Sequence, residues 1–434
     1  MDSASLYQYF KKHSQISTDT RNIIPGSLFF ALKGSNFNGN TFAEESLKAG
    51  AAYAVIDEEV FKKDERYILV QDVLTALQDL AKYHRTQLSI PILAITGSNG
   101  KTTTKELLSA VLKEKFTTYA TKGNLNNHIG VPLSVLEIND QTEIAIIEMG
   151  ANHPHEIAHL CTIAQPTHGL ITNVGKAHLE GFGGFEGVKK SKAELYEFLA
   201  QHDGALFLQG DNPDLLAMRG EKTFKEVKTY GFFEENDIYG RVLRQDPYLA
   251  ISWTGNTINH EVQTQIVGSY NLENILAAVC VGSYFNVSPD SINKGLEKYV
   301  PHNNRSQVLK TENNTLICDY YNANASSMAA AIENFNSLKN YPKKVIILGD
   351  MFELGEETSR EHENILGKAM FATSDACIFV GKAFYEHQRN IEGVRFFETT
   401  EQAVDYLKEK PFQDSLILLK ASRGMAFEKI IEIL

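Results

Sequence analysis

The sequence has 434 residues, a length typical of about three domains. Of these residues, 43% are hydrophobic and 22% charged, which is typical of a globular protein. A net charge of -12 argues against a nucleic-acid-binding protein, and no apolar run approaches the ~20 residues that cross a bilayer. The first residues, MDSASLYQYFKKHS, lack the apolar core of a secretion signal, so we expect a cytoplasmic protein. The four cysteines lie far apart in apolar surroundings and are expected to be reduced thiols: Cys161, Cys280, Cys318 and Cys377.

The first segment, up to about residue 88, mixes short strand-like runs with one amphipathic helix and turns rich in glycine and asparagine. The runs are SLFFAL (27–32), AAYAVID (51–57) and RYILV (66–70). From Pro91 onward, short apolar strands alternate with helical stretches, the pattern of a parallel sheet covered by helices. Strands are expected in ILAIT (92–96), EIAIIEMG (143–150), HGLITNVG (168–175) and GALFLQGD (204–211).

The pattern becomes hairpin-like between Tyr239 and Gly268, and a helix is expected from Asn271. After the polar junction PHNNRSQ (301–307), the alternation of strands and helices resumes. Its strands are expected in TLICDYY (315–321), KVIILGD (344–350), ACIFVG (376–381) and SLILLKASR (415–423). The sequence therefore predicts an α/β protein of three domains, with boundaries near residues 88 and 304: 1–88, 89–304 and 305–434.

The stretch AITGSNGKTTTKE, residues 94–106, predicts a phosphate-binding loop between a strand and a helix. The expected loop residues are Gly97, Ser98, Asn99, Gly100, Lys101 and Thr102. Gly97 and Gly100 let backbone N–H groups turn toward phosphate oxygens, Lys101 is placed to neutralise the β- and γ-phosphates, and the Thr102 hydroxyl is placed to hold Mg²⁺. The loop is shorter than the usual one, because Ile95 stands where that pattern has its first glycine.

Polar residues follow the next predicted strands. Asn124, Asn126 and Asn127 lie in the segment TKGNLNNHIGVPLSVL, which suits either a polar ligand or a capped turn. Glu148 ends an apolar strand, at the edge where open α/β sheets bind ligands. A carboxylate beside a phosphate loop is a natural Mg²⁺ ligand, although a charge that ends a strand is often only solvated.

His178 and Lys192 form a further pair of candidates. His178 follows a strand in a glycine-rich loop, and a neutral imidazole binds metals, although most loop histidines face solvent. Lys192 falls within a stripe of apolar residues on the next predicted helix, together with Val188, Leu195 and Leu199. A lysine that faces the interior must be paired, neutralised or chemically altered, unless its stem only snorkels to the surface.

The last segment repeats the pattern of polar strand ends. Asp319 and Asp350 each follow an apolar strand, and Lys420 and Arg423 lie near the end of another. Several polar strand ends in one α/β domain indicate a second edge that faces a ligand. We therefore expect the central and last domains to face each other across a nucleotide.

Nine motifs, taken in order, resemble those of the Mur ligase family, and within it the branch that adds D-alanyl-D-alanine to a UDP-N-acetylmuramoyl-tripeptide. The resemblance covers nearly the whole chain, and the short T-G-x-x-G-K-T loop is the family's own form. The motifs are STDTRNIIPGSLFFALKG, TGSNGKTTTKE, GNLNNHIGVPLS, EMGANHPHEI, TNVGKAHLEGFG, GSYNLENILAA, DYYNANASSM, LGDMFELGE and KASRGM. The resemblance implies an N-terminal domain that binds the UDP substrate, a central P-loop ATP-binding domain and a C-terminal Rossmann-like domain.

The resemblance also implies a reaction and its cofactors. ATP would phosphorylate the terminal carboxylate of the tripeptide, and the amine of D-alanyl-D-alanine would attack the resulting acyl phosphate. Two Mg²⁺ ions and Lys101 would shield the negative charges that meet at the γ-phosphate. Glu148 aligns with a ligand of the first metal, whereas His178 and a carbamylated Lys192 align with ligands of the second.

The remaining site residues follow from the same resemblance. The nucleotide would contact Thr103 after the loop, Asn271 and Asn274 on the adenine side, and Arg305 and Asp319 near the ribose and phosphates. The uridine nucleotide would lie at Ser17, Thr18, Asp19, Thr20 and Arg21, with Lys33 and Gly34. Other substrate contacts are expected from Asn126, Asn127, Asn322, Asn324, Lys420 and Arg423. We expect a monomer that binds no nucleic acid and does not insert into membranes.

Two alternatives stay open at this point. The family member that adds diaminopimelate or lysine to the dipeptide carries a D-N-P-R signature in its last domain. Here the only DNP is Asp211–Pro213, in the central segment and followed by Asp214. A nucleotide-binding protein without ligase chemistry is the other alternative, and it would need neither an inward lysine nor a uridine-type first domain.

Overall fold

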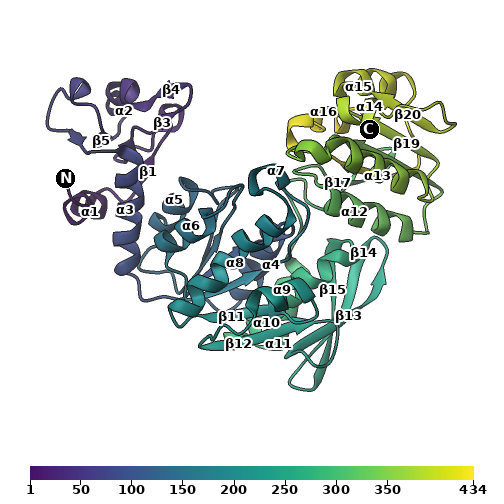
Figure 1. The fold of residues 1–434 in the computed structure, drawn as a ribbon, viewed down its shortest axis with the longest axis horizontal. Helices are drawn as coiled ribbons and strands as arrows, with labels where there is room; N and C mark the ends of the chain where they lie inside the picture. The colour runs from purple at the N-terminus through teal and green to yellow at the C-terminus, as the bar shows by residue number, and fades with distance from the viewer.

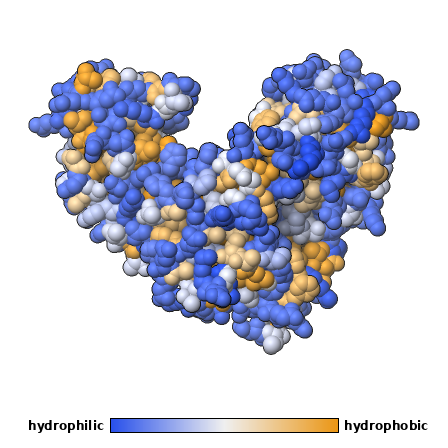
Figure 2. Space-filling view, viewed as in Figure 1, coloured by the Kyte–Doolittle hydropathy of each residue, from blue (hydrophilic) through white to orange (hydrophobic).

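The computed structural model describes residues 1–434 and contains three main β-sheets, each built from one of the three predicted segments. Figure 1 shows the N-terminal and C-terminal segments as two arms that rise from the central segment, and Figure 2 shows the molecule hollowed between them. The predicted α/β class is confirmed, while the boundaries at residues 88 and 304 stay a prediction. No helix is both long and apolar enough to cross a membrane.

The N-terminal arm is a four-stranded parallel sheet in the order β1-β2-β5-β6, with a separate hairpin β3-β4. Its strands are β1 Ile16–Ser17, β2 Leu28–Phe30, β3 Lys33–Gly34, β4 Phe37–Asn38, β5 Tyr53–Ile56 and β6 Tyr67–Leu69. The sequence predicted one helix here, but the structure has three: α1 Ser3–Lys12, α2 Ala43–Lys48 and α3 Val73–Thr86. The first two have only a weak apolar pattern in the sequence, because α1 buries only Leu6 and Phe10, and α2 has only six residues.

Helix α3 joins the N-terminal arm to the central segment. It begins at the cap Asp72, whose side chain accepts a hydrogen bond from the Thr75 N–H. Near its end, Arg85 is almost fully buried and donates to the carbonyls of Ala164 (3.1 Å) and Gln165 (3.2 Å). The apolar side chains of α3 belong to one hydrophobic core that contains residues of both segments. The arm is therefore attached by a buried interface as well as by the chain.

The central segment is a nine-stranded sheet in the order β15-β14-β13-β12-β11-β10-β7-β9-β8. The strands from β13 to β8 are parallel, and β13, β14 and β15 form an antiparallel extension where the sequence predicted a hairpin. The strands are β7 Ile92–Thr96, β8 Thr118–Ala120, β9 Ile144–Glu148, β10 His168–Ile171, β11 Ala205–Gln209, β12 Glu226–Gly231, β13 Ile238–Gln245, β14 Tyr248–Gly255 and β15 Ile258–Val267.

Helices cover both faces of this sheet (Figure 1). They are α4 Lys101–Leu112, α5 Gly130–Leu136, α6 Glu156–Ala164, α7 Leu179–Phe182, α8 Phe185–Gln201, α9 Pro213–Arg219, α10 Leu272–Tyr284 and α11 Pro289–Lys298. One face of α4 carries apolar residues, including Leu107 and Val111, that are completely buried against the sheet and α10. β7 lies inside the parallel part, between β10 and β9, so the loop that follows it opens at the crevice where such sheets bind ligands.

The C-terminal arm is a six-stranded sheet in the order β16-β17-β21-β18-β19-β20, parallel except for β16. Its strands are β16 Gln307–Lys310, β17 Asn314–Asp319, β18 Lys343–Gly349, β19 Ala376–Val380, β20 Val394–Phe397 and β21 Ser415–Lys420. Its helices are α12 Ala325–Ser337, α13 Thr358–Met370, α14 Lys382–Tyr385, α15 Thr400–Glu409 and α16 Glu428–Ile431. The four predicted strands are confirmed, and the two missed ones, β16 and β20, are short strands at the edges.

The central and C-terminal segments touch through polar contacts at separate points and through Val267 of β15, which is completely buried in a hydrophobic cluster of the C-terminal arm. Lys176 pairs with Glu361 (Nζ–Oε1 2.9 Å), and Gln245 donates to the Ser337 hydroxyl (2.7 Å). A third group of contacts joins the phosphate loop to the start of α12. These contacts close the cavity described below.

We expect Leu77→Ala to destabilise the protein by about 2–5 kcal/mol, because Leu77 is completely buried on α3 within the shared core. Urea unfolding followed by circular dichroism measures the loss. Leu74→Ala, on the half-buried side of the same helix, is the matched control and should lose less. Equal losses in the two variants would contradict the shared core.

Candidate active site

The glycine loop between β7 and α4 has the shape of a phosphate-binding loop. Gly97 and Gly100 have φ values of 139° and 79°, a region that residues with a side chain rarely adopt. A Cβ atom on Gly97 would also lie 2.0 Å from the Thr172 hydroxyl, on the loop after β10. Both glycines of the loop are therefore required by backbone conformation and by space, since a Cβ atom on Gly100 would lie 2.6 Å from Asn274 Oδ1.

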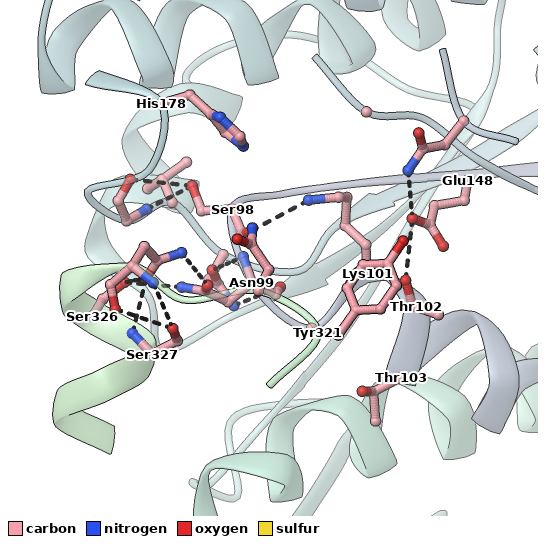
Figure 3. Close-up of a pocket in the computed structure, with 18 of the residues that line it drawn as sticks. Ser98, Asn99, Lys101, Thr102, Thr103, Glu148, His178, Tyr321, Ser326 and Ser327 are labelled. Carbon is pink, nitrogen blue, oxygen red and sulfur yellow. Dashed lines mark hydrogen bonds between the residues drawn. The ribbon is translucent and has the colours of Figure 1, made fainter. Parts of the chain in front are cut away.

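Lys101, the first residue of α4, is bonded to its own loop. Its Nζ donates to the carbonyls of Gly97 (2.6 Å) and Ser98 (3.3 Å). Burial lowers the pKa of Lys101, an effect that nearby Glu148 opposes and Arg305 reinforces. The side chain lies at the cavity between the loop and the C-terminal arm (Figure 3), where a triphosphate would offer it charged acceptors in place of carbonyls.

Glu148 ends β9, and its carboxylate is 1% exposed. Its Oε1 accepts hydrogen bonds from the Thr102 hydroxyl (3.2 Å) and from Asn126 Nδ2 (2.8 Å), as Figure 3 shows for Thr102. Its Oε2 is buried and has no hydrogen-bond partner. The closest cation is Lys105, whose Nζ lies 3.8 Å from Oε2. An orphaned carboxylate oxygen is a costly arrangement in a protein interior unless a ligand completes it.

Lys192 lies inside the protein, as the apolar stripe predicted. It is 2% exposed on α8, and its Nζ is 3.5 Å from the carbonyl oxygen of Ala151 and 5.3 Å from the centre of the Phe182 ring. Burial, reinforced by the charge of Lys101, lowers the pKa of Lys192 to about 7. The amine is therefore substantially unprotonated at neutral pH, the form in which an amine acts as a nucleophile.

His178 stands just before α7 with a positive φ of 53°. Burial lowers the pKa of His178, and the nearest charges are Glu353, Lys101 and Lys192. Its Nδ1 is bonded to Glu353, which lies after β18 in the C-terminal arm. Glu353 was not among the predicted site residues, since nothing in the sequence indicated which acidic residue would reach across.

A cavity of about 870 Å³ lies between the phosphate loop and the C-terminal arm (Figure 3). Most predicted site residues line it: Ser98, Asn99, Gly100, Lys101, Thr102, Thr103, Asn126, Asn127, Glu148, His178, Asn271, Asn274, Arg305, Asp319, Asn322, Asn324 and Lys420. Gly97, Lys192 and Arg423 lie behind or beside the lining rather than in it.

Asn271 and Asn274, on the predicted adenine side, are bonded to the protein itself. Asn271 donates to the carbonyl of Val267 (2.7 Å), and Asn274 donates to Asn271 Oδ1 (2.8 Å). Asn274 Oδ1 in turn accepts from the Thr104 hydroxyl of α4 (3.0 Å). The two amides thus brace the start of α4, and a nucleotide contact from them stays a prediction.

The C-terminal lining is built around Asp319 and Tyr321, at and after the end of β17. Lys420 Nζ lies 2.6 Å from Asp319 Oδ2, and this largely buried ion pair holds both side chains in place. The guanidinium carbon of Arg305 lies 3.8 Å above the centre of the Tyr321 ring, and that of Arg423 lies 5.2 Å from it. Tyr321 was missed by the sequence analysis, although it stands within the quoted motif DYYNANASSM.

Side chains of the phosphate loop also bond directly to the C-terminal arm. Asn324 Nδ2 donates to Asn99 Oδ1 (2.7 Å), and Asn99 Nδ2 donates to the Ser326 hydroxyl (2.9 Å). The sequence placed Asn99 at the nucleotide and Asn324 at a substrate, and it did not single out Ser326. The structure brings all three together.

The residues predicted for the uridine nucleotide lie in the N-terminal arm and do not line the cavity. Ser17 is buried and bonded to the Ser27 hydroxyl (3.0 Å). Asp19 and Arg21 form an exposed ion pair, and Lys33 pairs with Asp57 (2.8 Å). The remaining members are half-buried or exposed: Thr18, Thr20 and Gly34.

The fold and the site together define a class, a P-loop nucleotide-binding protein whose phosphate loop faces a second α/β domain. Comparison of the sequence with known families makes this specific. Residues 12–85 match the Mur ligase family catalytic domain, residues 95–282 the Mur ligase middle domain and residues 304–423 the Mur ligase glutamate ligase domain. The chain belongs to the Mur ligase family.

Relatives of known name are similar over nearly the full length. The UDP-N-acetylmuramoyl-tripeptide--D-alanyl-D-alanine ligase of Bacillus subtilis (strain 168) is 36% identical over 427 residues, covering 96% of this chain and 92% of that protein. The ligase of the same name from Escherichia coli (strain K12) is 33% identical, covering 96% and 93%. A crystal structure of MurF from Acinetobacter baumannii superposes with a TM-score of 0.88 at 28% identity, covering 99% and 98% of the two chains. MurF ligase from Thermotoga maritima in complex with ADP gives 0.85 at 26% identity, covering 97% of each.

We expect Lys192→Met to flatten the rise of stability with pH. The pKa of Lys192 is about 7 in the folded protein and 10.5 in its ordinary state, so the unfolded chain binds more protons between these values. Stability from this group therefore increases as the pH rises from 7 toward 10, and the methionine variant lacks that increase.

Urea unfolding at pH 7, 8 and 9 measures this difference. Lys190→Met, on the exposed side of the same helix, is the control and should keep the slope of the parent protein. A Lys192→Met slope equal to that of the parent would show that Lys192 keeps its ordinary pKa.

Proposed function

We propose that the protein joins D-alanyl-D-alanine to UDP-N-acetylmuramoyl-tripeptide at the expense of ATP, which yields the pentapeptide precursor of peptidoglycan. The full-length similarity to ligases of that name supports this function. The observation that carries it is the single cavity in which the phosphate loop, Glu148 and the polar strand ends of the C-terminal arm meet. A phosphate donor and an amine acceptor must approach one carboxylate, and this cavity has walls from two domains to hold them.

In the proposed reaction, an oxygen of the tripeptide's terminal carboxylate attacks the γ-phosphorus of ATP, and ADP leaves. The amine of D-alanyl-D-alanine then attacks the acyl phosphate carbonyl, and the tetrahedral intermediate expels phosphate as the amine loses its proton. Both steps gather negative charge. Lys101 of the phosphate loop on one side, and Arg305 and Lys420 of the C-terminal lining on the other, supply positive charge at the cavity, which is where preorganised electrostatics act most strongly.

Two Mg²⁺ ions fit the residues present. The Oε2 of Glu148, which has no hydrogen-bond partner, and the Thr102 hydroxyl would hold the first, because both are oxygen ligands beside the phosphate loop. Lys192 as an ammonium ion would repel a cation, whereas the carbamate formed from its unprotonated amine would bind one, with His178 as the neighbouring ligand. When bound, the ions would shield the charges of the phosphates and of the carboxylate.

The shape of the molecule fits a long substrate. We place the uridine nucleotide at Ser17, Arg21 and Lys33 in the N-terminal arm and the ATP in the cavity. The peptide would then cross the hollow between the arms that Figure 2 shows. We also propose that the protein acts as a cytoplasmic monomer, since one chain supplies every wall of the cavity.

The alternative with a D-N-P-R signature is not supported. The DNP of this chain lies in the central segment and has a structural role there. Asn212 caps α9, because its side chain accepts hydrogen bonds from the N–H groups of Asp214 (3.0 Å) and Leu215 (3.2 Å). Asp211 accepts from Asn236 Nδ2 (2.8 Å). The relatives named above carry the D-alanyl-D-alanine name rather than that of the alternative.

Release of phosphate from ATP tests the function directly. We expect release only when UDP-N-acetylmuramoyl-tripeptide and D-alanyl-D-alanine are both present. Lys101→Ala should lower the rate about a hundredfold or more and abolish the acyl phosphate intermediate, because it removes a charge at the transferred phosphate. Turnover with diaminopimelate or lysine and the dipeptide substrate would favour the other ligase, and turnover without any substrate would favour a non-ligase nucleotide-binding protein.

We expect Lys192→Ala to abolish turnover with the fold intact, and added formate or acetate to restore part of it by replacing the lost anion. Phosphate release measures the rate, and thermal unfolding checks the fold. Incorporation of ¹³C-labelled CO₂, observed by NMR in the parent and absent in the variant, detects the carbamate independently. Full activity in the variant would disprove the proposed role of Lys192.

A further inference from the structure

Three side chains form a closed ring of hydrogen bonds between the phosphate loop and the C-terminal arm (Figure 3). Asn324 donates to Asn99 (2.7 Å), Asn99 donates to Ser326 (2.9 Å), and Ser326 donates to Asn324 Oδ1 (2.9 Å). Each side chain is therefore both donor and acceptor. We call this feature the Asn99–Asn324–Ser326 ring. Such a ring constrains the separation of its members more tightly than a single bond, because no member can turn without breaking two bonds.

The side chain of Asn99 is not needed to hold its own loop. The Asn99 N–H donates to Asn173 Oδ1 (3.0 Å), and its carbonyl accepts from the Thr172 hydroxyl (2.6 Å) and Asn173 Nδ2 (3.1 Å). These backbone bonds all lie within the central segment. Both polar atoms of the side chain are directed instead to the other domain. One residue of the phosphate loop thus contacts two domains through two separate sets of atoms.

On the C-terminal side, the ring is anchored at the start of α12. Asn324 caps this helix, because its Oδ1 also accepts from the Ser327 N–H (2.9 Å). The residues just before it, 319–322, carry Asp319, Tyr321 and Asn322 into the cavity. Any shift of Asn324 relative to the phosphate loop therefore moves these lining groups relative to the phosphates.

The close approach also depends on a residue without a side chain. A Cβ atom on Gly175 would lie 2.9 Å from the Ser326 hydroxyl and 3.4 Å from Asn99 Nδ2. Gly175 has no positive φ, so its backbone conformation does not itself require glycine. Glycine is needed at position 175 because the contact between the two domains leaves no space for a side chain there.

We propose that Asn99, Asn324 and Ser326 are positioning residues, which set the distance between the phosphate loop and the C-terminal groups that line the cavity. This inference rests on the proposed ligase function. It assigns Asn99 to the domain contact rather than to the nucleotide, and Asn324 to the same contact rather than to a substrate. The ring thereby makes the position of the C-terminal wall of the cavity depend on the conformation of the phosphate loop.

Three single variants test the ring by steady-state kinetics. Asn324→Asp keeps the oxygen that caps α12 but loses the donor to Asn99, while Asn99→Ala and Ser326→Ala remove one member each. We expect each to lower kcat about tenfold with KM for ATP within twofold of the parent. The double variant Asn99→Ala/Ser326→Ala should be no worse than either single one, because the first substitution already breaks the ring. Gly175→Ala should act in the same way as Ser326→Ala.

Gln245→Ala is the matched control. It removes a hydrogen bond between the same two segments, to Ser337 at the other end of α12, away from the phosphate loop. We expect the kinetics of the parent. If this control lost kcat equally, any weakened domain contact would explain the effect and the ring would have no special role.

The opposite pattern would overturn the proposal. If Asn99→Ala raised KM for ATP or weakened ADP binding in calorimetry tenfold while Ser326→Ala matched the parent, Asn99 would be a nucleotide ligand. Additive losses in the double variant would likewise contradict the ring. X-ray scattering with a non-hydrolysable ATP analogue gives a test without turnover, since ring variants should show a larger radius of gyration than the parent. An unchanged radius would count against the ring, whereas absent ligase turnover in the parent protein would count only against the proposed function.

Discussion

The buried carboxylate of Glu148 beside the phosphate loop is the interaction around which the central domain is organised. One oxygen accepts hydrogen bonds from Thr102 of α4 and from Asn126 of the segment after β8, while the other has no hydrogen-bond partner. Lys105, completely buried, lies behind it and bonds to the Thr121 carbonyl (2.6 Å). This arrangement leaves one oxygen available for a cation while the protein supplies enough compensating charge to keep the carboxylate inside.

The same loop is constrained from three directions. The glycines permit its turn, Asn274 braces the first turn of α4, and the C-terminal arm contacts it through Asn99. Lys101 is the one cation of the loop, and its bonds go to carbonyl oxygens that cannot compete with a phosphate for an ammonium group. The backbone of the loop is therefore held in place, whereas the hydrogen bonds of Lys101 to carbonyl oxygens can be exchanged for bonds to a nucleotide.

The two arms are attached to the central domain by different kinds of interface. The N-terminal arm shares a hydrophobic core through α3, with Arg85 bonded to carbonyls of the central segment. The C-terminal arm is held by polar contacts such as Lys176–Glu361 and the Asn99–Asn324–Ser326 ring, and Val267 is the one fully buried apolar side chain of the central segment that belongs to its core. Polar contacts exchange with water at small net cost, whereas a shared apolar core does not. The C-terminal arm is thus the part better suited to move during a reaction cycle.

The sequence by itself determined the α/β class, the strands with strong apolar runs, the phosphate loop and the inward position of Lys192. These features are local, because hydrophobic periodicity and glycine spacing act within one element. It did not reveal α1, α2 and the short edge strands, whose apolar signal is too brief to stand out. Only the tertiary structure showed that Glu353 reaches His178, that Tyr321 stacks with Arg305 and that Asn99 bonds to Asn324. Each of these pairs joins residues far apart in the chain, and no local pattern encodes which of many polar side chains the folding of two domains will bring within bonding distance.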